Sequence, residues 1–281
     1  MFKGAITAIV TPFKNGQIDY DAYEKLVKFQ IKGKIDGVVP CGTTGESATL
    51  SYDEHNKVVE MTVKLVNKKV PVIAGTGANS TDEALELTAY AKKVGADASL
   101  QVTPYYNKPS QEGLYRHFKK IAENIDIPII LYNVPGRTGV NLSPETVVRL
   151  SQIPNIVGIK EASGNINQVT EICRSVKKKN FSVLSGDDSL TLPILSVGGV
   201  GVISVASNIV PAKISKMIDL YLKGDVQKAV ALHYELYPLM QSLFIETNPV
   251  PVKAALNLMG MINNEVRLPL SELSDANIAN I

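Results

Sequence analysis

Short runs of almost uninterrupted apolar residues recur along the chain, separated by longer segments of mixed polarity. A parallel strand that is covered on both faces produces such runs, because neither of its faces has to meet water. The pattern predicts eight strands, at residues 4–10, 37–40, 70–74, 98–102, 127–132, 156–160, 181–185 and 201–205.

The segments between these strands carry apolar residues three and four positions apart, which is the period of an amphipathic helix. Ser80 precedes one such segment as an N-cap, and Ser143 followed by Pro144 marks the start of another. Gly33 and Gly224 stand where two of the helices should end. The clearest helices are predicted at residues 20–32, 53–67, 81–93 and 111–124.

A strand followed by a helix, eight times over, predicts an α/β fold and specifically a (β/α)8 or TIM barrel. A doubly wound parallel sheet is the alternative that the order of elements leaves open. We expect residues 1–208 to form the barrel core, and residues 209–281 to form the last barrel helix and a C-terminal helical extension packed on the barrel. Asn248, before Pro249, is interpreted as the N-cap of a helix in that extension.

Composition narrows the class of protein. Apolar residues make up 45% of the chain and charged residues 20%, which excludes a disordered, collagen-like or coiled-coil protein. The formal charge of +2 argues against a nucleic acid or a membrane surface as partner. Two cysteines make no disulfide framework, and neither a membrane span nor a secretory leader is visible. We therefore expect a cytoplasmic globular protein.

Polar and reactive side chains follow the predicted strands. In a (β/α)8 barrel the chemistry lies at the carboxyl ends of the strands, where all eight βα loops meet. Hydroxyls, phenols, one lysine and one arginine should therefore converge on one rim of the barrel. The residues concerned are Thr43, Thr44, Tyr105, Tyr106, Tyr132, Arg137, Lys160 and Gly186.

Lys160 ends an apolar strand, and apolar surroundings disfavour the charged form of an amine. A neutral amine is the nucleophile that forms a Schiff base with a keto acid. The alternatives are a lysine that extends its ammonium group to solvent and one that pairs with Glu161. Tyr132 could move protons if Thr43 and Tyr106 shared them, although most tyrosines simply pack.

Two features could bind carboxylates. Thr43, Thr44 and Gly45 could present backbone N–H groups to a carboxylate. Arg137 has a planar guanidinium suited to bidentate carboxylate binding, and its alternative is an ordinary surface arginine.

Other familiar signals are weak. The run that starts at Gly75 lacks the third glycine of a dinucleotide-binding fingerprint. Asp187 and Asp188 follow the seventh strand, where barrels often bind phosphate, and their charges would repel it. The three histidines have no metal-ligand spacing, so we expect no metal. Both cysteines are interpreted as small buried hydrophobic residues.

Three ordered motifs now point to a family. They are Gly-Thr-Thr-Gly-Glu-Ser at 42–47, Tyr-Asn-Val-Pro-Gly-Arg-Thr-Gly at 132–139 and Gly-Ile-Lys-Glu-Ala-Ser at 158–163. Together they resemble the dihydrodipicolinate synthase family, and the match extends from residue 4 to Asn-Pro-Val-Pro-Val-Lys at 248–253. N-acetylneuraminate lyases of the same superfamily share the lysine and the tyrosine. They generally resemble Gly-Ser-Thr-Gly-Glu in the first motif and lack the arginine.

The resemblance implies that pyruvate condenses with L-aspartate-4-semialdehyde to 4-hydroxy-tetrahydrodipicolinate, the first committed step of diaminopimelate and lysine biosynthesis. It implies a Schiff base on Lys160 and proton transfer by Tyr132. Thr43 would link Tyr132 to Tyr106, which in the family enters the site from the neighbouring subunit. No metal or organic cofactor is implied, and the family is usually a homotetramer built as a dimer of dimers.

The same resemblance implies contacts with both substrates. Thr44 and the backbone of Ile203 would hold the carboxylate of pyruvate, with Gly186 also in the substrate site. Arg137 would hold the carboxylate of the semialdehyde.

A regulatory site for L-lysine is also implied, at a dimer interface. Glu83 would pair with the α-ammonium group of lysine, and His55 would act as a neutral acceptor. Tyr52 is a departure, because lysine-sensitive members typically carry histidine or tryptophan there. The residues implied are Ser47, Ala48, His55, Asn79, Glu83 and Tyr105.

Two alternative functions stay open. One is a lyase for N-acetylneuraminate or a 2-keto-3-deoxy sugar acid on the same scaffold. The other is a barrel that binds keto acids as a sensor and performs no chemistry. A sensor would have no use for Lys160 together with Tyr132, Thr43 and Tyr106.

Overall fold

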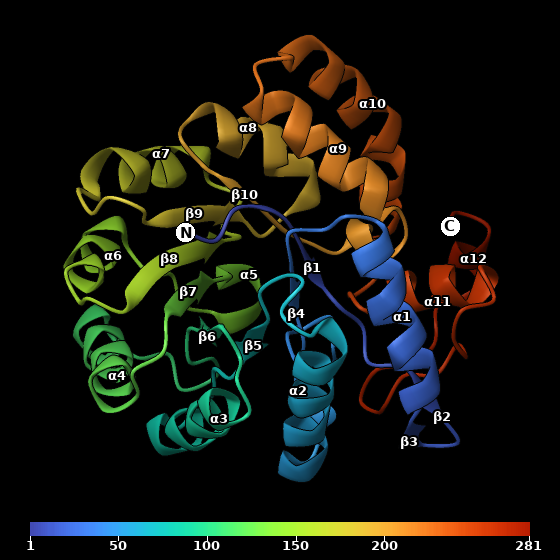
Figure 1. Cartoon of the computed structure of the whole chain (residues 1–281), viewed down its shortest axis with the longest axis horizontal. Helices are drawn as coiled ribbons and strands as arrows, with labels where there is room; N and C mark the ends of the chain where they lie inside the picture. The colour runs from blue at the N-terminus through green and yellow to red at the C-terminus, as the bar shows by residue number, and fades with distance from the viewer.

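The computed structural model describes residues 1–281, and a ring of parallel strands lies at its centre (Figure 1). The strands are β1 Gly4–Ala8, β4 Gly37–Val39, β5 Ile73–Gly75, β6 Ala98–Val102, β7 Ile129–Asn133, β8 Ile156–Glu161, β9 Ser182–Ser185 and β10 Gly201–Ser204. They follow one another in the order β4-β1-β10-β9-β8-β7-β6-β5. Each predicted apolar run overlaps one of them, with ends that differ by a few residues.

The sheet closes on itself between β4 and β5. Val38 and Val72 form a parallel bridge, and the Val38 N–H donates to the Pro71 carbonyl at 3.0 Å. A doubly wound sheet would leave two free edges instead. The structure therefore confirms the (β/α)8 barrel with appended C-terminal helices.

Helices surround the ring, one after each strand, and further helices follow at the C-terminus (Figure 1). Those around the ring are α1 Tyr20–Lys32, α2 Tyr52–Val66, α3 Thr81–Lys93, α4 Gln111–Asn124, α6 Pro144–Ser151, α7 Ile166–Ser175, α8 Thr191–Ser196 and α9 Pro211–Leu222. The C-terminal helices are α10 Val226–Ser242, α11 Val250–Leu258 and α12 Asp275–Ile278. None of the helices combines the length and hydrophobicity needed to cross a bilayer.

The loops also contain short strands and one-turn helices that the sequence pattern did not predict. A two-stranded hairpin follows β1, and one-turn helices follow several strands. They are β2 Phe13–Lys14, β3 Gln17–Ile18, η1 Ser47–Thr49, α5 Pro135–Thr138, η2 Asp188–Leu190 and η3 Ala206–Asn208. These elements have too few residues for a hydrophobic period to show.

Local sequence explains where the long helices begin. The Ser51 side chain and Glu54 at the start of α2 form a reciprocal capping box. Ser80 caps α3 as predicted, and Ser143 caps α6 with Pro144 in its first turn. These caps satisfy N–H groups that have no partner inside the helix.

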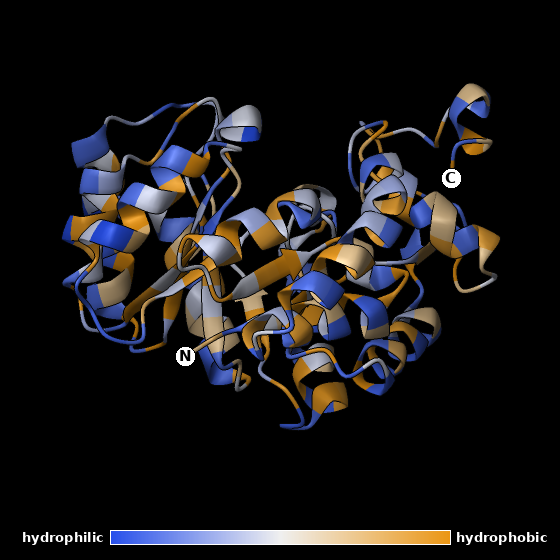
Figure 2. Cartoon of the chain, turned by 90° about the horizontal axis from the view of Figure 1, so that it is seen from above, coloured by the Kyte–Doolittle hydropathy of each residue, from blue (hydrophilic) through white to orange (hydrophobic).

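Apolar side chains pack in two shells, inside the ring and between the ring and the helices. Figure 2 shows the apolar colour on the central strands and the polar colour mainly on the outer helices. The inner shell includes Ile6, Val39, Ile73, Leu100, Ile130, Leu184 and Ile203. The barrel is therefore filled at its centre, and a substrate can enter only at an end.

The C-terminal helices share a hydrophobic core with the barrel. Leu236 of α10 and Leu256 of α11 belong to the same buried cluster as Ala5 of β1 and Leu26 of α1. One prediction here was wrong: Pro249, not Asn248, is the cap residue of α11, and no side chain caps this helix. The Asn248 side chain is instead directed to the barrel rim.

Candidate active site

Lys160 and Tyr132 lie side by side at the carboxyl ends of β8 and β7. The two residues are paired in register across these strands, so both side chains are on the same face of the sheet. The Lys160 Nζ lies 4.1 Å from the centroid of the Tyr132 ring. Each residue is only 7% exposed. The amine therefore lies against an aromatic face in a largely enclosed position.

Glu161 does not pair with Lys160. Successive side chains of a strand point to opposite faces, so Glu161 is directed away from the barrel interior. Its carboxylate accepts hydrogen bonds from Asn133 Nδ2, the Ser163 N–H and Gln168 Nε2. Because these groups satisfy Glu161 and Lys160 is buried, neither alternative from the sequence, ion pairing or extension to solvent, describes Lys160.

The backbone of Gly186 packs against the aliphatic part of the Lys160 side chain. Its N–H donates to the Glu161 carbonyl at 2.8 Å, which draws the loop after β9 against β8. A Cβ at this position would lie 3.1 Å from Lys160 Cε and 2.6 Å from Ala162 Cβ. Only a glycine fits here without movement of its neighbours.

The loop after β10 is held by a buried carboxylate. Asp188 accepts hydrogen bonds from the Ser204 hydroxyl and from the N–H groups of Val205 and Ala206. Burial raises the pKa of Asp188, and these hydrogen bonds oppose that rise. The backbone that follows Ile203 is thereby fixed at the rim.

The loop after β4 forms a closed turn that carries Thr43 and Thr44. The Gly45 N–H donates to the Gly42 carbonyl, and the Glu46 N–H donates to the Thr43 carbonyl, both at 3.0 Å. Thr44 is only 3% exposed, and its Oγ1 accepts a hydrogen bond from Asn248 Nδ2 at 3.0 Å. The Thr44 hydroxyl hydrogen is therefore free to be donated elsewhere.

Asn248 joins the two predicted carboxylate-binding residues. Its side chain reaches Thr44, and its backbone carbonyl accepts a hydrogen bond from Arg137 Nη2 at 3.0 Å. Its Oδ1 is buried and has no hydrogen-bond partner. Sequence reasoning missed this position, because Asn before Pro also signals a helix start. Its only other signal was its place in the last stretch of the family match.

Tyr106 does not complete the site within one chain. The residue is 91% exposed, and its backbone φ of 65° is one that residues other than glycine rarely adopt. The Thr43 hydroxyl makes no hydrogen bond to Tyr132 or Tyr106. The link between Thr43, Tyr132 and Tyr106 stays a prediction that requires a second subunit.

A cavity of about 390 Å³ lies beside the rim. Its wall includes Thr43, Arg137 and Asn248 but not Lys160 or Tyr132. The wall also includes five of the six residues implied for L-lysine, namely Ser47, Ala48, His55, Glu83 and Tyr105. Asn79 is not part of this wall, but its Oδ1 accepts a hydrogen bond from the N–H of Tyr105, which is, at 2.8 Å.

Two side chains set the polarity of this cavity. His55 Nε2 donates to the Gly75 carbonyl at 2.7 Å, which leaves the buried Nδ1 as an unpartnered acceptor. Burial lowers the pKa of His55, which favours the neutral ring. Desolvation, together with the nearby Glu83 carboxylate, raises the pKa of Tyr52.

Cys41 is buried beside this rim, where its Sγ donates to the His55 carbonyl at 3.6 Å. Burial raises the pKa of the Cys41 thiol, which disfavours the nucleophilic thiolate. No cluster of three or more histidine, cysteine, aspartate or glutamate side chains is arranged to hold a metal ion.

Comparison with known proteins gives consistent results. The model of the dihydrodipicolinate synthetase family matches residues 1–280. The 4-hydroxy-tetrahydrodipicolinate synthase of Thermodesulfovibrio yellowstonii is 59% identical over 277 residues, which cover 99% of this chain and 95% of that protein.

Two solved structures are also similar. The dihydrodipicolinate synthase of Acinetobacter baumannii, described as complexed with pyruvate, is 48% identical with a TM-score of 0.97 and covers 100% of this chain and 97% of that one. The enzyme of Cyanidioschyzon merolae, described with lysine bound, is 44% identical with a TM-score of 0.96 and covers 99% and 95%. This chain therefore belongs to the dihydrodipicolinate synthetase family.

Proposed function

We propose that this chain condenses pyruvate with L-aspartate-4-semialdehyde to 4-hydroxy-tetrahydrodipicolinate, as a 4-hydroxy-tetrahydrodipicolinate synthase of the diaminopimelate and lysine pathway. The observation that carries this proposal is Lys160, enclosed at the barrel rim and stacked over Tyr132 without an acidic partner. The name of the T. yellowstonii relative and the pyruvate complex of the A. baumannii relative support it.

The reaction begins with attack of the neutral Lys160 amine on the keto carbon of pyruvate. Loss of water gives an imine, and removal of a methyl proton gives an enamine. The enamine carbon attacks the aldehyde, and the substrate amine then attacks the imine carbon, which closes the ring and releases Lys160. Tyr132 is placed to move the protons, and the protonated imine itself accepts the electron pair.

The substrates are held through their carboxylates. Thr44 accepts from Asn248 and so keeps its own hydroxyl hydrogen for the pyruvate carboxylate. The backbone of Ile203 and Gly186 would hold the same carboxylate in this proposal, and Arg137 at the cavity wall suits the carboxylate of the semialdehyde.

The complete catalyst is a homotetramer, a dimer of dimers, in this proposal. The exposed Tyr106 of one subunit then joins Thr43 and Tyr132 of its neighbour. We also place the enzyme in the cytoplasm, where its two free cysteines stay reduced.

Reduction of the imine tests the proposed chemistry. Incubation with pyruvate and borohydride should attach the keto acid irreversibly to Lys160, which peptide mapping by mass spectrometry detects. Lys160→Arg should abolish the adduct, because a guanidinium group stays protonated. Lys178→Arg, a control at a lysine that only bonds backbone carbonyls, should leave it unchanged. An adduct on another lysine would contradict the assignment.

The choice of aldehyde separates the alternatives. With pyruvate and no borohydride, the enzyme should turn over L-aspartate-4-semialdehyde and not N-acetylmannosamine or a sugar aldehyde. Turnover of a sugar aldehyde would favour the lyase alternative, and an absence of both adduct and turnover would favour a sensor.

We further propose that L-lysine inhibits this enzyme from the cavity beside the rim. Five of the implied residues line the cavity, and the free Nδ1 of His55 can accept from an ammonium group. The C. merolae relative described with lysine bound supports this proposal. Tyr52 weakens the site in this proposal, because its hydroxyl is close enough to Glu83 for the carboxylate to raise its pKa, and it competes there with the ammonium group of lysine.

An activity titration with L-lysine tests the regulatory site. We expect weak to moderate inhibition, abolished by Glu83→Ala. Tyr52→His should strengthen inhibition, because it frees the Glu83 carboxylate. A rate that stays flat up to millimolar lysine would reject the site.

A further inference from the structure

A fully buried ion pair connects the C-terminal extension to the loop that carries Thr43 and Thr44. Lys253 of α11 donates from Nζ to Glu46 Oε1 at 2.5 Å, and the two side chains are 0% and 1% exposed. Removal of two charges from water is costly, so such a pair persists only where its geometry is good and its other hydrogen-bonding sites are satisfied.

The surroundings of the pair meet that condition. Lys253 Nζ also donates to the Thr11 carbonyl at 2.9 Å and lies 4.2 Å from the centroid of the Phe13 ring. The second oxygen of Glu46 accepts from the Arg267 N–H at 3.1 Å. Burial lowers the pKa of Lys253 while the Glu46 charge opposes this shift, so the charged state of the lysine depends on its partner.

Glu46 occupies a backbone conformation that needs such support. Its φ is 54°, in the left-handed region that residues with a side chain rarely adopt. Its N–H closes the turn on the Thr43 carbonyl, so the backbone position of Glu46 sets the position of the two threonines.

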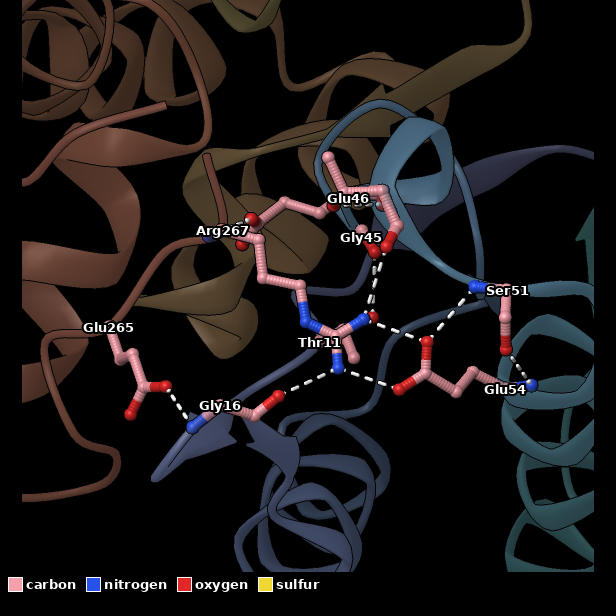
Figure 3. Close-up of polar contacts among 9 residues, drawn as sticks. Thr11, Gly16, Gly45, Glu46, Ser51, Glu54, Glu265 and Arg267 are labelled. Atoms are coloured by element: carbon pink, nitrogen blue, oxygen red, sulfur yellow. Dashed lines mark hydrogen bonds and ion pairs between the residues drawn. The ribbon is translucent and has the colours of Figure 1, made fainter. Parts of the chain in front are cut away.

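Thr11 holds the same turn from the other side. Its hydroxyl donates to the Gly45 carbonyl at 2.7 Å, while its own carbonyl accepts from Lys253. Lys253 therefore contacts both supports of the turn, Glu46 and Thr11. Figure 3 shows Thr11, Gly45 and Glu46 converging near Arg267 of the C-terminal segment.

We propose that Lys253 and Glu46 are positioning residues, which hold the turn at residues 42–46 so that Thr44 meets the carboxylate of the keto acid. The inference rests on the proposed function, because the keto acid is the pyruvate that reacts with Lys160. In this proposal the two residues do not bind the keto acid themselves, and the pair acts through the turn at residues 42–46.

A neighbouring ion pair provides the control for a merely stabilising role. Arg267 bonds both oxygens of Glu54 and the carbonyls of Gly16 and Thr49 (Figure 3). Its side chain does not bond Glu46, since only its backbone N–H does. Arg267→Met thus removes an ion pair of the same network and leaves the Lys253–Glu46 pair in place.

The test measures how borohydride trapping at Lys160 depends on pyruvate concentration, in Lys253→Met, Glu46→Gln and Arg267→Met variants. A misplaced binding group can cost up to about 100-fold, so we expect the half-saturating pyruvate concentration to rise about 10- to 100-fold in the first two variants. Arg267→Met should lower the melting temperature and leave this concentration unchanged. In steady state, the KM for pyruvate should rise while the KM for the semialdehyde stays near that of the unmodified enzyme.

Removal of one partner leaves a lone buried charge and can prevent folding, so the Lys253→Met/Glu46→Leu double variant is measured as well. This double variant leaves no unpaired charge in the interior, but it also lacks the hydrogen bonds to the turn. Its half-saturating pyruvate concentration should therefore still be raised. An unchanged half-saturating concentration in the folded variants would overturn the inference. An unmodified enzyme that forms no adduct would instead overturn the proposed function on which it rests.

Discussion

At the scale of single residues, the reactive amine is positioned by what surrounds it more than by bonds of its own. Lys160 stacks on Tyr132 on one side and meets the backbone of Gly186 on the other. Glu161 is turned away and satisfied by other groups. The side chain of the lysine is thus confined by packing, and small changes in that packing should alter its chemistry.

Gly186→Ala tests this confinement. The added methyl group would lie 3.1 Å from Lys160 Cε and 2.6 Å from Ala162 Cβ, so the lysine stem and the backbone at Ala162 both have to move. We expect imine formation with pyruvate, followed by borohydride trapping, to slow by about 10- to 100-fold, together with a lower melting temperature. Gly136→Ala is the matched control, because its methyl group would meet no atom within 4 Å. Equal rates of imine formation in the two variants would show that packing around Gly186 does not confine the Lys160 side chain.

At the scale of elements, the barrel's outer helices pack through some polar contacts that depend on pH. His117 of α4 is 7% exposed and its Nδ1 lies 2.9 Å from the Thr81 hydroxyl at the start of α3. Its Nε2 is buried without a partner. Burial lowers the pKa of His117 to about 4 from the ordinary value of 6.5.

The pH dependence of unfolding follows from that shift. The unfolded chain takes up a proton on His117 near its ordinary pKa, whereas the native chain resists until about pH 4. The contribution of a neutral His117 is therefore complete above about pH 6.5 and is lost as the pH falls toward 4, by at most about 3 kcal/mol. Urea unfolding of the protein and of His117→Gln should show a difference in unfolding free energy that shrinks over this range. A difference that does not change with pH would contradict the burial argument.

At the scale of the whole molecule, a single chain contains most of the predicted site but not all of it. Tyr106 is exposed on the loop after β6 and makes no hydrogen bond to Tyr132. Tyr105 beside it lines the cavity that we propose for L-lysine, so the regulatory and catalytic residues are adjacent in the chain. Assembly of subunits would bring both functions to one interface.

Mixed oligomers test whether the site is shared. Tyr106→Phe should slow turnover by about 10²–10⁴-fold, the usual contribution of a positioned proton-transfer group. Tyr106→Phe chains and Lys160→Ala chains, each inactive alone, should recover activity when they assemble together, because one site then has both groups. A lack of recovery in oligomers verified as mixed would mean that each chain works by itself.

The sequence by itself determined the elements and their order. Helices α1, α3 and α4 begin and end where the apolar period and the caps predicted, because those signals act between residues three or four positions apart. The eight strands were recognisable for a similar reason, since a strand covered on both faces is apolar throughout. Because parallel strands bring their carboxyl ends to one rim, Lys160 and Tyr132 could also be placed together.

Only the tertiary structure decided which distant residues support that rim. Asn248 bonds Thr44 across 204 positions of the chain, and Lys253 bonds Glu46 across 207. No local period encodes such contacts, because they arise when the C-terminal extension packs on the closed barrel. Asn248 therefore had the signal of a helix cap and Lys253 that of an ordinary lysine, and their burial beside a strained turn gives them their roles.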